Sequence, residues 1–375
     1  MQNPFKNILV IRLGAIGDLV HVTPSLDQVY HSRKDIHIHL LSDSPLAEWL
    51  KTNAYQDKAF TVWKLKPYFG VFSLFQKLFQ LAAVLRKAPI DSIVNLHPAF
   101  KTYLLAALLL PPWQWLSRIR VYKKQKVKAK GKWQRSVRRL HAVENFYQPF
   151  QQLLALPEAS LEELSPQFSL KETSDSKTLN PHPLQNRALQ VALIAGVGTQ
   201  RQNRAWPTGK WLSLLRYFNI DQHSPQGRWA DIAHFHFIGG PDEIPLYQSI
   251  LAGLPPAIQS LCINHAGKTS LSETIGILQK SDIVIAADTG PLHIAAALER
   301  PVVALFGPTS IIRTGARSVR QGKIHHLRPQ DSLDCWPCEK PSCPLSGEEH
   351  LACMEQIQPE TVIQACRNLL EHRTE

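Results

Sequence analysis

The sequence predicts an α/β protein made of two doubly wound domains, and two observations support this prediction. A chain of 375 residues is longer than a single hydrophobic core usually supports, so two domains of about 150 to 200 residues each are expected. Short apolar, β-rich runs alternate with helix-length segments in both halves, which is typical of parallel sheets built from βαβ units. A hydrophobic content of 44% and a charged content of 19% fit a globular chain.

The strand-like runs divide into two groups on either side of a polar segment. They lie at 7–13, 36–42 and 91–97 in the first half, and at 189–196, 233–240, 281–288 and 301–307 in the second. Residues 169–188 are polar, contain two prolines and show no sustained period, which indicates a linker. We therefore expect domains at 1–175 and 186–357. A C-terminal helix opening near Pro359 follows within 358–375, with packing against the first domain as one option.

Composition excludes several classes of protein. The first residues, MQNPFKN, are polar and lack a signal-peptide pattern, and the apolar run at 103–110 stops at Pro111 and Pro112. Six cysteines in a chain of this length, with Cys262 and Cys366 isolated, do not form a secreted disulfide framework. We expect a cytoplasmic protein that does not cross a bilayer. The sequence contains no P-loop, kinase, nucleophile-elbow or HExxH pattern.

Positive charge is concentrated in one segment. The formal net charge is +12, and eleven Lys and Arg residues lie between Arg118 and Arg139 with no acid among them. This distribution indicates a polyanionic partner, which could be nucleic acid, an anionic membrane surface or a phosphorylated ligand. A solvated loop is the alternative interpretation.

The first candidate site is the stretch GAIGD at residues 14–18, between a strand-like run and a helical stretch. It is not the dinucleotide fingerprint, because Gly14 and Gly17 are three apart and the third glycine is missing. Glycines allow close approach of the backbone to a ligand, and Asp18 falls in the first turn of the helix. Taken alone, the pattern favours a capping aspartate, which would stabilise the helix by about 1 kcal/mol.

The second candidate site follows the strand at 281–288. Asp288 ends this strand, Thr289 and Gly290 lie in the turn, and His293 lies just inside a helix of small residues. Free N–H groups and the positive end of the helix dipole at such a start bind diphosphate well. A capped helix with a core histidine is the structural alternative.

Two further strand ends carry candidate ligand groups. Thr199 follows Gly196 and Gly198, and Arg204 precedes a helix expected near Pro207. Arg204 is suited to bidentate phosphate binding, although an exposed loop arginine would give the same pattern. Glu243 follows a strand and a glycine pair, a position suited to a ribose diol but also to an ordinary turn residue.

Three stretches resemble the heptosyltransferase family, glycosyltransferase family 9. They are ILVIRLGAIGDLVHVTPSL, NRAWP and, with the highest specificity, ADTGPLHIAAALERPVVALFGPTS, which occur in the family's order over nearly the whole chain. The resemblance implies a GT-B fold, in which two Rossmann-like domains face each other across a cleft. It also implies inverting transfer of heptose from ADP-heptose to a Kdo or heptose hydroxyl of the lipid A-linked core oligosaccharide.

The resemblance assigns roles to residues of this chain. It makes Asp18 the general base, and places the donor on Thr199, Arg204, Glu243, Asp288, Thr289, Gly290 and His293. Candidate acceptor contacts, by position and resemblance, are Gly17, His97, Lys101, Lys123 and Lys124. It implies that ADP-sugar is a substrate, and we expect that no cofactor or metal is required and that no nucleic acid is a partner. The basic segment would then attract the enzyme to its acceptor and to the inner face of the cytoplasmic membrane.

Several alternatives stay open at this stage. Residues 71–88 place Phe72, Phe75, Leu78, Phe79, Ala82 and Leu85 on one helical face, for which we prefer a core-facing helix to a membrane-surface helix. Cys335, Cys338, Cys343 and Cys353 could bind zinc by count, but their spacing departs from paired CxxC ribbons, and we predict no metal. The chain could use another sugar nucleotide, or be a non-catalytic nucleotide-binding or RNA-binding protein.

Overall fold

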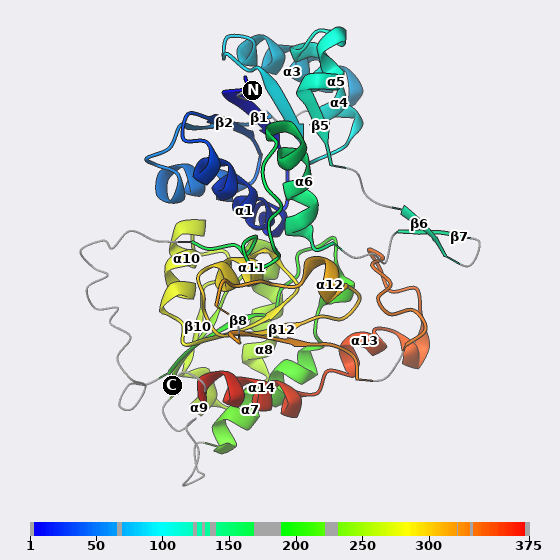
Figure 1. Ribbon diagram of the computed structural model, residues 1–375. Helices are drawn as coiled ribbons and strands as arrows, with labels where there is room; N and C mark the ends of the chain where they lie inside the picture. The colour runs from blue at the N-terminus through cyan, green and yellow to red at the C-terminus, as the bar shows by residue number, and fades with distance from the viewer. Residues whose placement is uncertain are drawn as a thin grey trace. The chain divides into compact units, whose positions relative to one another are not determined.

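The computed structural model divides into two compact units, residues 1–170 and residues 171–375 (Figure 1). It describes residues 4–65, 70–122, 126–129, 132–135, 140–168, 189–221, 232–320, 322–330 and 333–371. The linker expected at 169–188, and the candidate acceptor residues Lys123 and Lys124, lie outside the described residues.

The first unit is built on a parallel sheet of order β3-β2-β1-β4-β5. Its strands are β1 (Asn7–Ile11), β2 (His37–Leu41), β3 (Phe60–Trp63), β4 (Ser92–Asn95) and β5 (Ile119–Val121). The central strand β1 pairs with β2 on one side and β4 on the other, with Val10 opposite Leu40 and Val94. An uninterrupted apolar run such as 8–11 fits a strand buried on both faces, and these four residues are fully buried.

Helices complete the first unit. They are α1 (Ile16–Ser32), α2 (Pro45–Trp49), α3 (Gly70–Leu85), α4 (Phe100–Leu109), α5 (Trp115–Arg118) and α6 (Ala142–Leu154), with the short π-helix η1 (Leu50–Ala54) and the 3₁₀ helix η2 (Pro112–Gln114). Helix α1 packs on α6, and α3 packs on α4. Leu9 and Ile11 join the core under α3 and α4. Within the basic segment, β6 (Lys126–Ala129) and β7 (Lys132–Arg135) pair as an antiparallel hairpin.

The helix predicted at 71–88 is present as α3, but its apolar stripe is only partly buried. Leu78, Ala82 and Leu85 are buried in the core, whereas Phe72 is 86% exposed and Phe79 is 55% exposed. The stripe covers about 140° of the helix surface, from Leu85 round to Phe72, which is wider than one neighbouring helix can cover. The prediction of a core-facing helix is therefore wrong for these two phenylalanines.

The second unit contains a six-stranded parallel sheet of order β10-β9-β8-β11-β12-β13. Its strands are β8 (Leu189–Ile194), β9 (Ile232–Phe237), β10 (Cys262–Asn264), β11 (Ile283–Ala287), β12 (Val302–Leu305) and β13 (Ile324–Leu327). The first strand in the chain again lies beside the fourth. Ligands of such sheets bind beyond the carboxyl ends of these two strands, where the strand order reverses. The predicted α/β class with two doubly wound sheets is confirmed.

The helices of the second unit surround this sheet. They are α7 (Thr208–Asp221), α8 (Ile244–Ala252), α9 (Pro256–Gln259), α10 (Leu271–Lys280), α11 (Gly290–Ala297), α12 (Ile311–Thr314), α13 (Ala352–Glu355) and α14 (Pro359–Glu371). Short 3₁₀ turns are η5 (Gln202–Arg204), η7 (Pro241–Glu243) and η8 (Gly347–Glu349). Among the described residues, no helix is long and apolar enough to cross a membrane.

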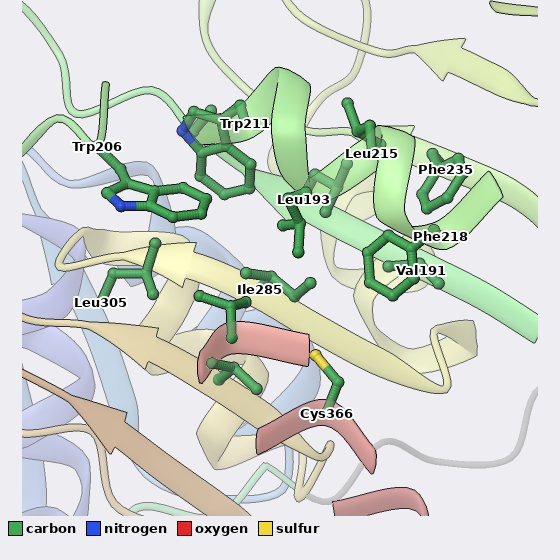
Figure 2. Close-up of a cluster of buried hydrophobic side chains, with 14 of the residues drawn as sticks. Val191, Leu193, Trp206, Trp211, Leu215, Phe218, Phe235, Ile285, Leu305 and Cys366 are labelled. Carbon is green, nitrogen blue, oxygen red and sulfur yellow. The ribbon is translucent and has the colours of Figure 1, made fainter. Parts of the chain in front are cut away.

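The C-terminal helix α14 begins at Pro359, as predicted, and packs in the second unit. Cys366 lies in the core with Val191 and Leu193 of β8, Ile285 of β11 and the two tryptophans Trp206 and Trp211 (Figure 2). Helix α14 also contacts α7, β12 and β13. Its apolar face is thus buried in its own unit, and the option that this helix also packs on the first domain stays a prediction.

Candidate active site

Asp18 lies just beyond the carboxyl end of β1, where the first sheet reverses its strand order. It is the third residue of α1, and Ala15, not Asp18, occupies the N-cap position. The capping interpretation is therefore wrong. The backbone of Ala15 has φ 60° and ψ 121°, a conformation that is costly for a residue with a Cβ. Backbone strain of this kind concentrates at functional sites.

The carboxylate of Asp18 is held by Arg12, the residue that follows β1. The Arg12 Nη2 donates to Asp18 Oδ2 in a close ion pair, and Nη1 donates to the carbonyl of Leu96 at 2.6 Å. The guanidinium also lies over the ring of Phe146, 5.0 Å from its centroid. Within the part of the chain that the structure describes, Asp18 Oδ1 accepts no hydrogen bond, and the side chain is 34% exposed. One oxygen is thus fixed and the other is available.

Sequence reasoning missed Arg12, although a signal was present. Arg12 is a cation directly after four fully buried apolar residues, and a charge at the end of a buried strand needs a partner. The partner could not be named from sequence alone, because Leu96 is brought to Arg12 only by the pairing of β1 with β4.

Two of the candidate acceptor residues lie beyond the adjacent strand end, that of β4. The backbone of His97 donates to Asn95 Oδ1 at 3.0 Å, and its carbonyl accepts from Thr102 Oγ1 at 2.6 Å. Lys101 is the second residue of α4, and Gly17 precedes Asp18 in α1. The structure therefore brings Gly17, Asp18, His97 and Lys101 to one edge of the first sheet, and their roles stay predictions.

In the second unit, Arg204, Asp288 and His293 form one cluster beyond β8 and β11. Arg204 Nη1 donates to the carbonyl of Asp288 at 3.0 Å and lies 3.0 Å from its Oδ2. His293 Nε2 lies 3.5 Å from Asp288 Oδ1. Burial alone raises the pKa of Asp288, but its neighbours His293, Arg204 and Thr309 together outweigh burial, so the pKa is lowered.

This geometry gives Asp288 a positioning role. Its side chain is only 4% exposed, while that of Arg204 is 23% exposed. A buried carboxylate of this kind fixes the orientation of the cations around it. Direct contact of Asp288 with a donor stays a prediction, as does the alternative that His293 is only a core histidine.

The start of α11 lies directly after Asp288. Thr289 is the N-cap residue, but its hydroxyl donates back to the carbonyl of Ala287 at 3.2 Å and does not cap the helix. The first N–H groups of α11, beginning at Gly290, thus donate no bond to the cap side chain. Such a helix start favours an anion, because the N–H groups and the dipole point toward it.

Glu243 joins two loops at the carboxyl ends of β8 and β9. Its Oε1 accepts from the Gly198 N–H at 3.0 Å, and its Oε2 accepts from the Gly240 N–H at 2.8 Å. A Cβ at Gly196 or Gly239 would overlap this carboxyl group, so glycine at both positions leaves room for Glu243 in this orientation. Glu243 therefore has the structural role of a turn residue, which is the alternative to ribose binding. It also orders the loop that leads to the exposed Thr199. Ribose binding by Glu243 stays a prediction.

Tyr247, one turn beyond Glu243, is a second residue that sequence reasoning missed. Its buried hydroxyl accepts from the Ala195 N–H at 3.0 Å and donates to the Ile238 carbonyl at 2.7 Å. Burial raises the pKa of this phenol. Tyr247 thus ties the ends of β8 and β9 together beneath the loops held by Glu243.

The four clustered cysteines line one small cavity. Cys335, Cys338, Cys343 and Cys353 surround it together with Asn203, which precedes Arg204. Burial and the neighbouring thiols raise the pKa of Cys353 to about 11. Among the described residues, no group of three or more His, Cys, Asp or Glu side chains is arranged to hold a metal ion. The prediction of no metal still awaits a test.

Comparison with known proteins extends this description. The fold matches "Structure of E. coli ADP-heptose lps heptosyltransferase II" with a TM-score of 0.71 and 20% identity, covering 98% of this chain and 100% of that one. The two units therefore form the GT-B fold of glycosyltransferases. The family model "Glycosyltransferase family 9 (heptosyltransferase)" matches residues 79–343. The chain belongs to glycosyltransferase family 9.

Curated relatives are similar over different lengths. Lipooligosaccharide heptosyltransferase 2 of Campylobacter jejuni is 34% identical over 109 residues, which are 29% of this chain and 32% of that protein. Lipopolysaccharide heptosyltransferase 1 of Campylobacter coli is 24% identical over 335 residues, covering 83% and 86% of the two chains. The chain thus spans about a third of the first relative and most of the second.

Proposed function

We propose that this chain is an inverting heptosyltransferase of lipopolysaccharide core assembly. The donor would be ADP-heptose, and the acceptor a Kdo or heptose hydroxyl of the lipid A-linked core oligosaccharide. The observation that carries the proposal is the placement of the candidate residues. In each unit most of them lie beyond the two strands where the strand order reverses, with the partly exposed carboxylate of Asp18 in one unit and the cluster of Arg204, Asp288 and His293 in the other.

Asp18 is the proposed general base. As the acceptor oxygen bonds to the anomeric carbon, its proton would pass to Asp18 Oδ1, while Arg12 keeps Oδ2 and the orientation of the carboxylate fixed. Inversion requires the hydroxyl to attack from the face opposite the departing diphosphate. The bond from the anomeric carbon to the diphosphate oxygen breaks, and its electron pair leaves with that oxygen.

The charge that develops on the diphosphate would be met in the second unit. Arg204 supplies a guanidinium oriented by Asp288, and the start of α11 supplies N–H groups and its dipole. His293 would add a donor from the same helix. These groups stabilise a leaving anion without a metal or cofactor, and we propose that none is required.

The proposal is tested by incubating the purified protein with a panel of sugar nucleotides and truncated core lipid. Transfer from ADP-heptose, and not from UDP-glucose or GDP-mannose, is expected, with the new bond showing the anomeric configuration opposite to that of the donor. If transfer occurs only from another sugar nucleotide, the chain is a glycosyltransferase with a different donor and the claim of heptose transfer is wrong. Sequence-tolerant RNA binding without any transfer would favour a non-catalytic protein.

We further propose that the protein works at the inner face of the cytoplasmic membrane as a peripheral protein, with no nucleic acid partner. The acid-free run of cations from Arg118 to Arg139 supports this location, because acceptor carboxylates and phosphates and anionic lipids share one sign of charge.

A further inference from the structure

The positive charge of this protein lies almost entirely in one part of the first unit. Between Lys58 and Val143 the sequence contains eighteen of its 42 Lys and Arg residues but only one of its 30 Asp and Glu residues, Asp91. The other 289 residues carry 24 cations against 29 acids. Asp91 itself accepts the backbone N–H groups of Lys6 and Asn7 at 2.8 and 2.9 Å, so the single acid is occupied.

The same part of the chain also carries most of the exposed apolar surface. Of the twelve large hydrophobic side chains that are exposed among the described residues, eight lie between Phe72 and Leu116. Six of them, from α3, α4, η2 and α5, are here called the aromatic face: Phe72, Phe79, Phe100, Tyr103, Trp113 and Leu116. Their exposure reaches 86% for Phe72, 80% for Trp113 and 93% for Leu116. Exposed apolar residues are normally scattered singly, so this concentration indicates a binding surface.

Neighbouring helices join the residues of the aromatic face. Phe72, Phe75 and Phe79 lie on successive turns of α3, and the ring of Phe75 contacts that of Phe100 on α4 edge to face, with centroids 6.4 Å apart. Tyr103 follows Phe100 by one turn. Helices α3 and α4 lie side by side, with α5 close to them (Figure 1).

The end of the aromatic face is fixed by two side chains. Trp115 Nε1 donates to the carbonyl of Leu110 at 2.7 Å, which anchors η2 and α5 to the end of α4. Arg86, from the turn after α3, donates through Nη2 to the carbonyl of Leu108 at 2.6 Å. The exposed Trp113 and Leu116 are therefore held on an ordered scaffold.

We propose that the aromatic face docks on an anionic lipid bilayer. Trp and Tyr prefer the headgroup level of a membrane, and Phe and Leu enter the acyl boundary when presented beside cations. Lys77 on α3, Lys101 on α4 and Arg118 on α5 lie on the same elements as the aromatic side chains. A second protein fits less well, because lysines are depleted at protein interfaces. This inference deepens the proposed function by naming the surface that meets the membrane of the acceptor.

Vesicle flotation tests the proposal without any catalysis. Two double variants, Phe72→Ser with Phe100→Ser and Trp113→Ser with Leu116→Ser, each lower apolar exposure without touching the buried core. Binding to phosphatidylcholine vesicles with about one third phosphatidylglycerol is expected to fall at least about tenfold in each. The matched control, Ile312→Ser with Val319→Ser, changes exposed apolar residues of the second unit and is expected to bind like the unaltered chain.

Several results would overturn the proposal. One is equal flotation of the variants and the unaltered chain. Another is binding of the unaltered chain to pure phosphatidylcholine vesicles as strong as its binding to the anionic vesicles. The third is a dimer in solution that the unaltered chain forms and the variants do not. Transfer to a soluble, delipidated acceptor separates this proposal from the proposed function. If soluble transfer proceeds but vesicles are not bound, the membrane surface is wrong and the function stands. If vesicles are bound but no transfer occurs, the membrane surface stands and the proposed function is wrong.

Discussion

The sharpest stability prediction concerns Asp27, on the same helix as Asp18. Asp27 Oδ1 accepts the hydroxyl of Tyr55 at 2.9 Å, and burial raises its pKa from 3.8 to about 6 despite this bond and the nearby charges of His31 and Lys58. The folded state thus holds the proton more tightly than the unfolded state. Its stability should fall as pH rises from about 4 to about 6, since the unfolded chain ionises first.

The size of the effect follows from the shift. A difference of about two pKa units between the folded and unfolded states lowers the free energy of unfolding by at most about 3 kcal/mol at pH 7, and by about 0.5 kcal/mol at pH 4. The half-buried position of Asp27 makes the larger figure an upper limit. Asp27→Asn keeps an acceptor for Tyr55 but cannot ionise, so it should stabilise the first unit by up to that amount at pH 7 and by little at pH 4.

Urea unfolding followed by circular dichroism at pH 4, 5 and 7 measures this difference. Asp242→Asn, at an exposed position in the second unit, is the control and should show no such dependence on pH. A stability gain for Asp27→Asn that is the same at all three pH values would refute the reasoning. A loss of stability at pH 7 would also refute it.

Three further predictions concern the candidate site and its surroundings. Arg204→Met should weaken ADP-heptose binding at least about tenfold, because the donor diphosphate loses the guanidinium that Asp288 orients. Arg201→Met in the same loop should not weaken it, and equal affinities of the two variants would contradict this prediction. Replacing Lys123, Lys124, Lys126 and Lys128 with Gln should raise the acceptor KM roughly fivefold and make it depend less on salt concentration. The same change at the control positions Lys34, Lys51, Lys268 and Lys280 should have neither effect. Identical acceptor kinetics of the two variants would argue against electrostatic steering by the basic segment. Elemental analysis of protein purified without chelator should find only substoichiometric zinc and iron; one ion per chain, lost when Cys335 and Cys338 are replaced by Ser, would reverse that prediction.

The sheet centres could be predicted from sequence, and the sheet edges could not. Strands β1, β8 and β11 are apolar runs buried on both faces, so their composition alone identifies them. Edge strands such as β3 (FTVW) and β13 (IHHL) are four residues long and only partly buried, so they lack the fully buried apolar run that identifies a central strand. Their pairing depends on neighbours far away in the sequence.

The candidate site shows the same division. The positions of Asp18, Asp288 and His293 could be predicted because a strand, a turn and a helix start follow one another locally in the chain. Their partners could not, since Arg12 is fixed by Leu96 and Glu243 by Gly198, both brought close only by the folded sheets. The stripe on α3 was misread for a related reason. Its period predicted a helix, but the sheet and α4, against which α3 packs, decide which part of the stripe is buried.

The central claim is that Asp18 removes the proton from the acceptor hydroxyl. The most direct test compares Asp18→Asn with the unaltered chain in both transfer and donor binding. The substitution should lower kcat at least about a hundredfold and leave the Kd for ADP-heptose within about threefold, because a base contributes to the chemical step and not to donor affinity. Unchanged turnover by Asp18→Asn would contradict the account.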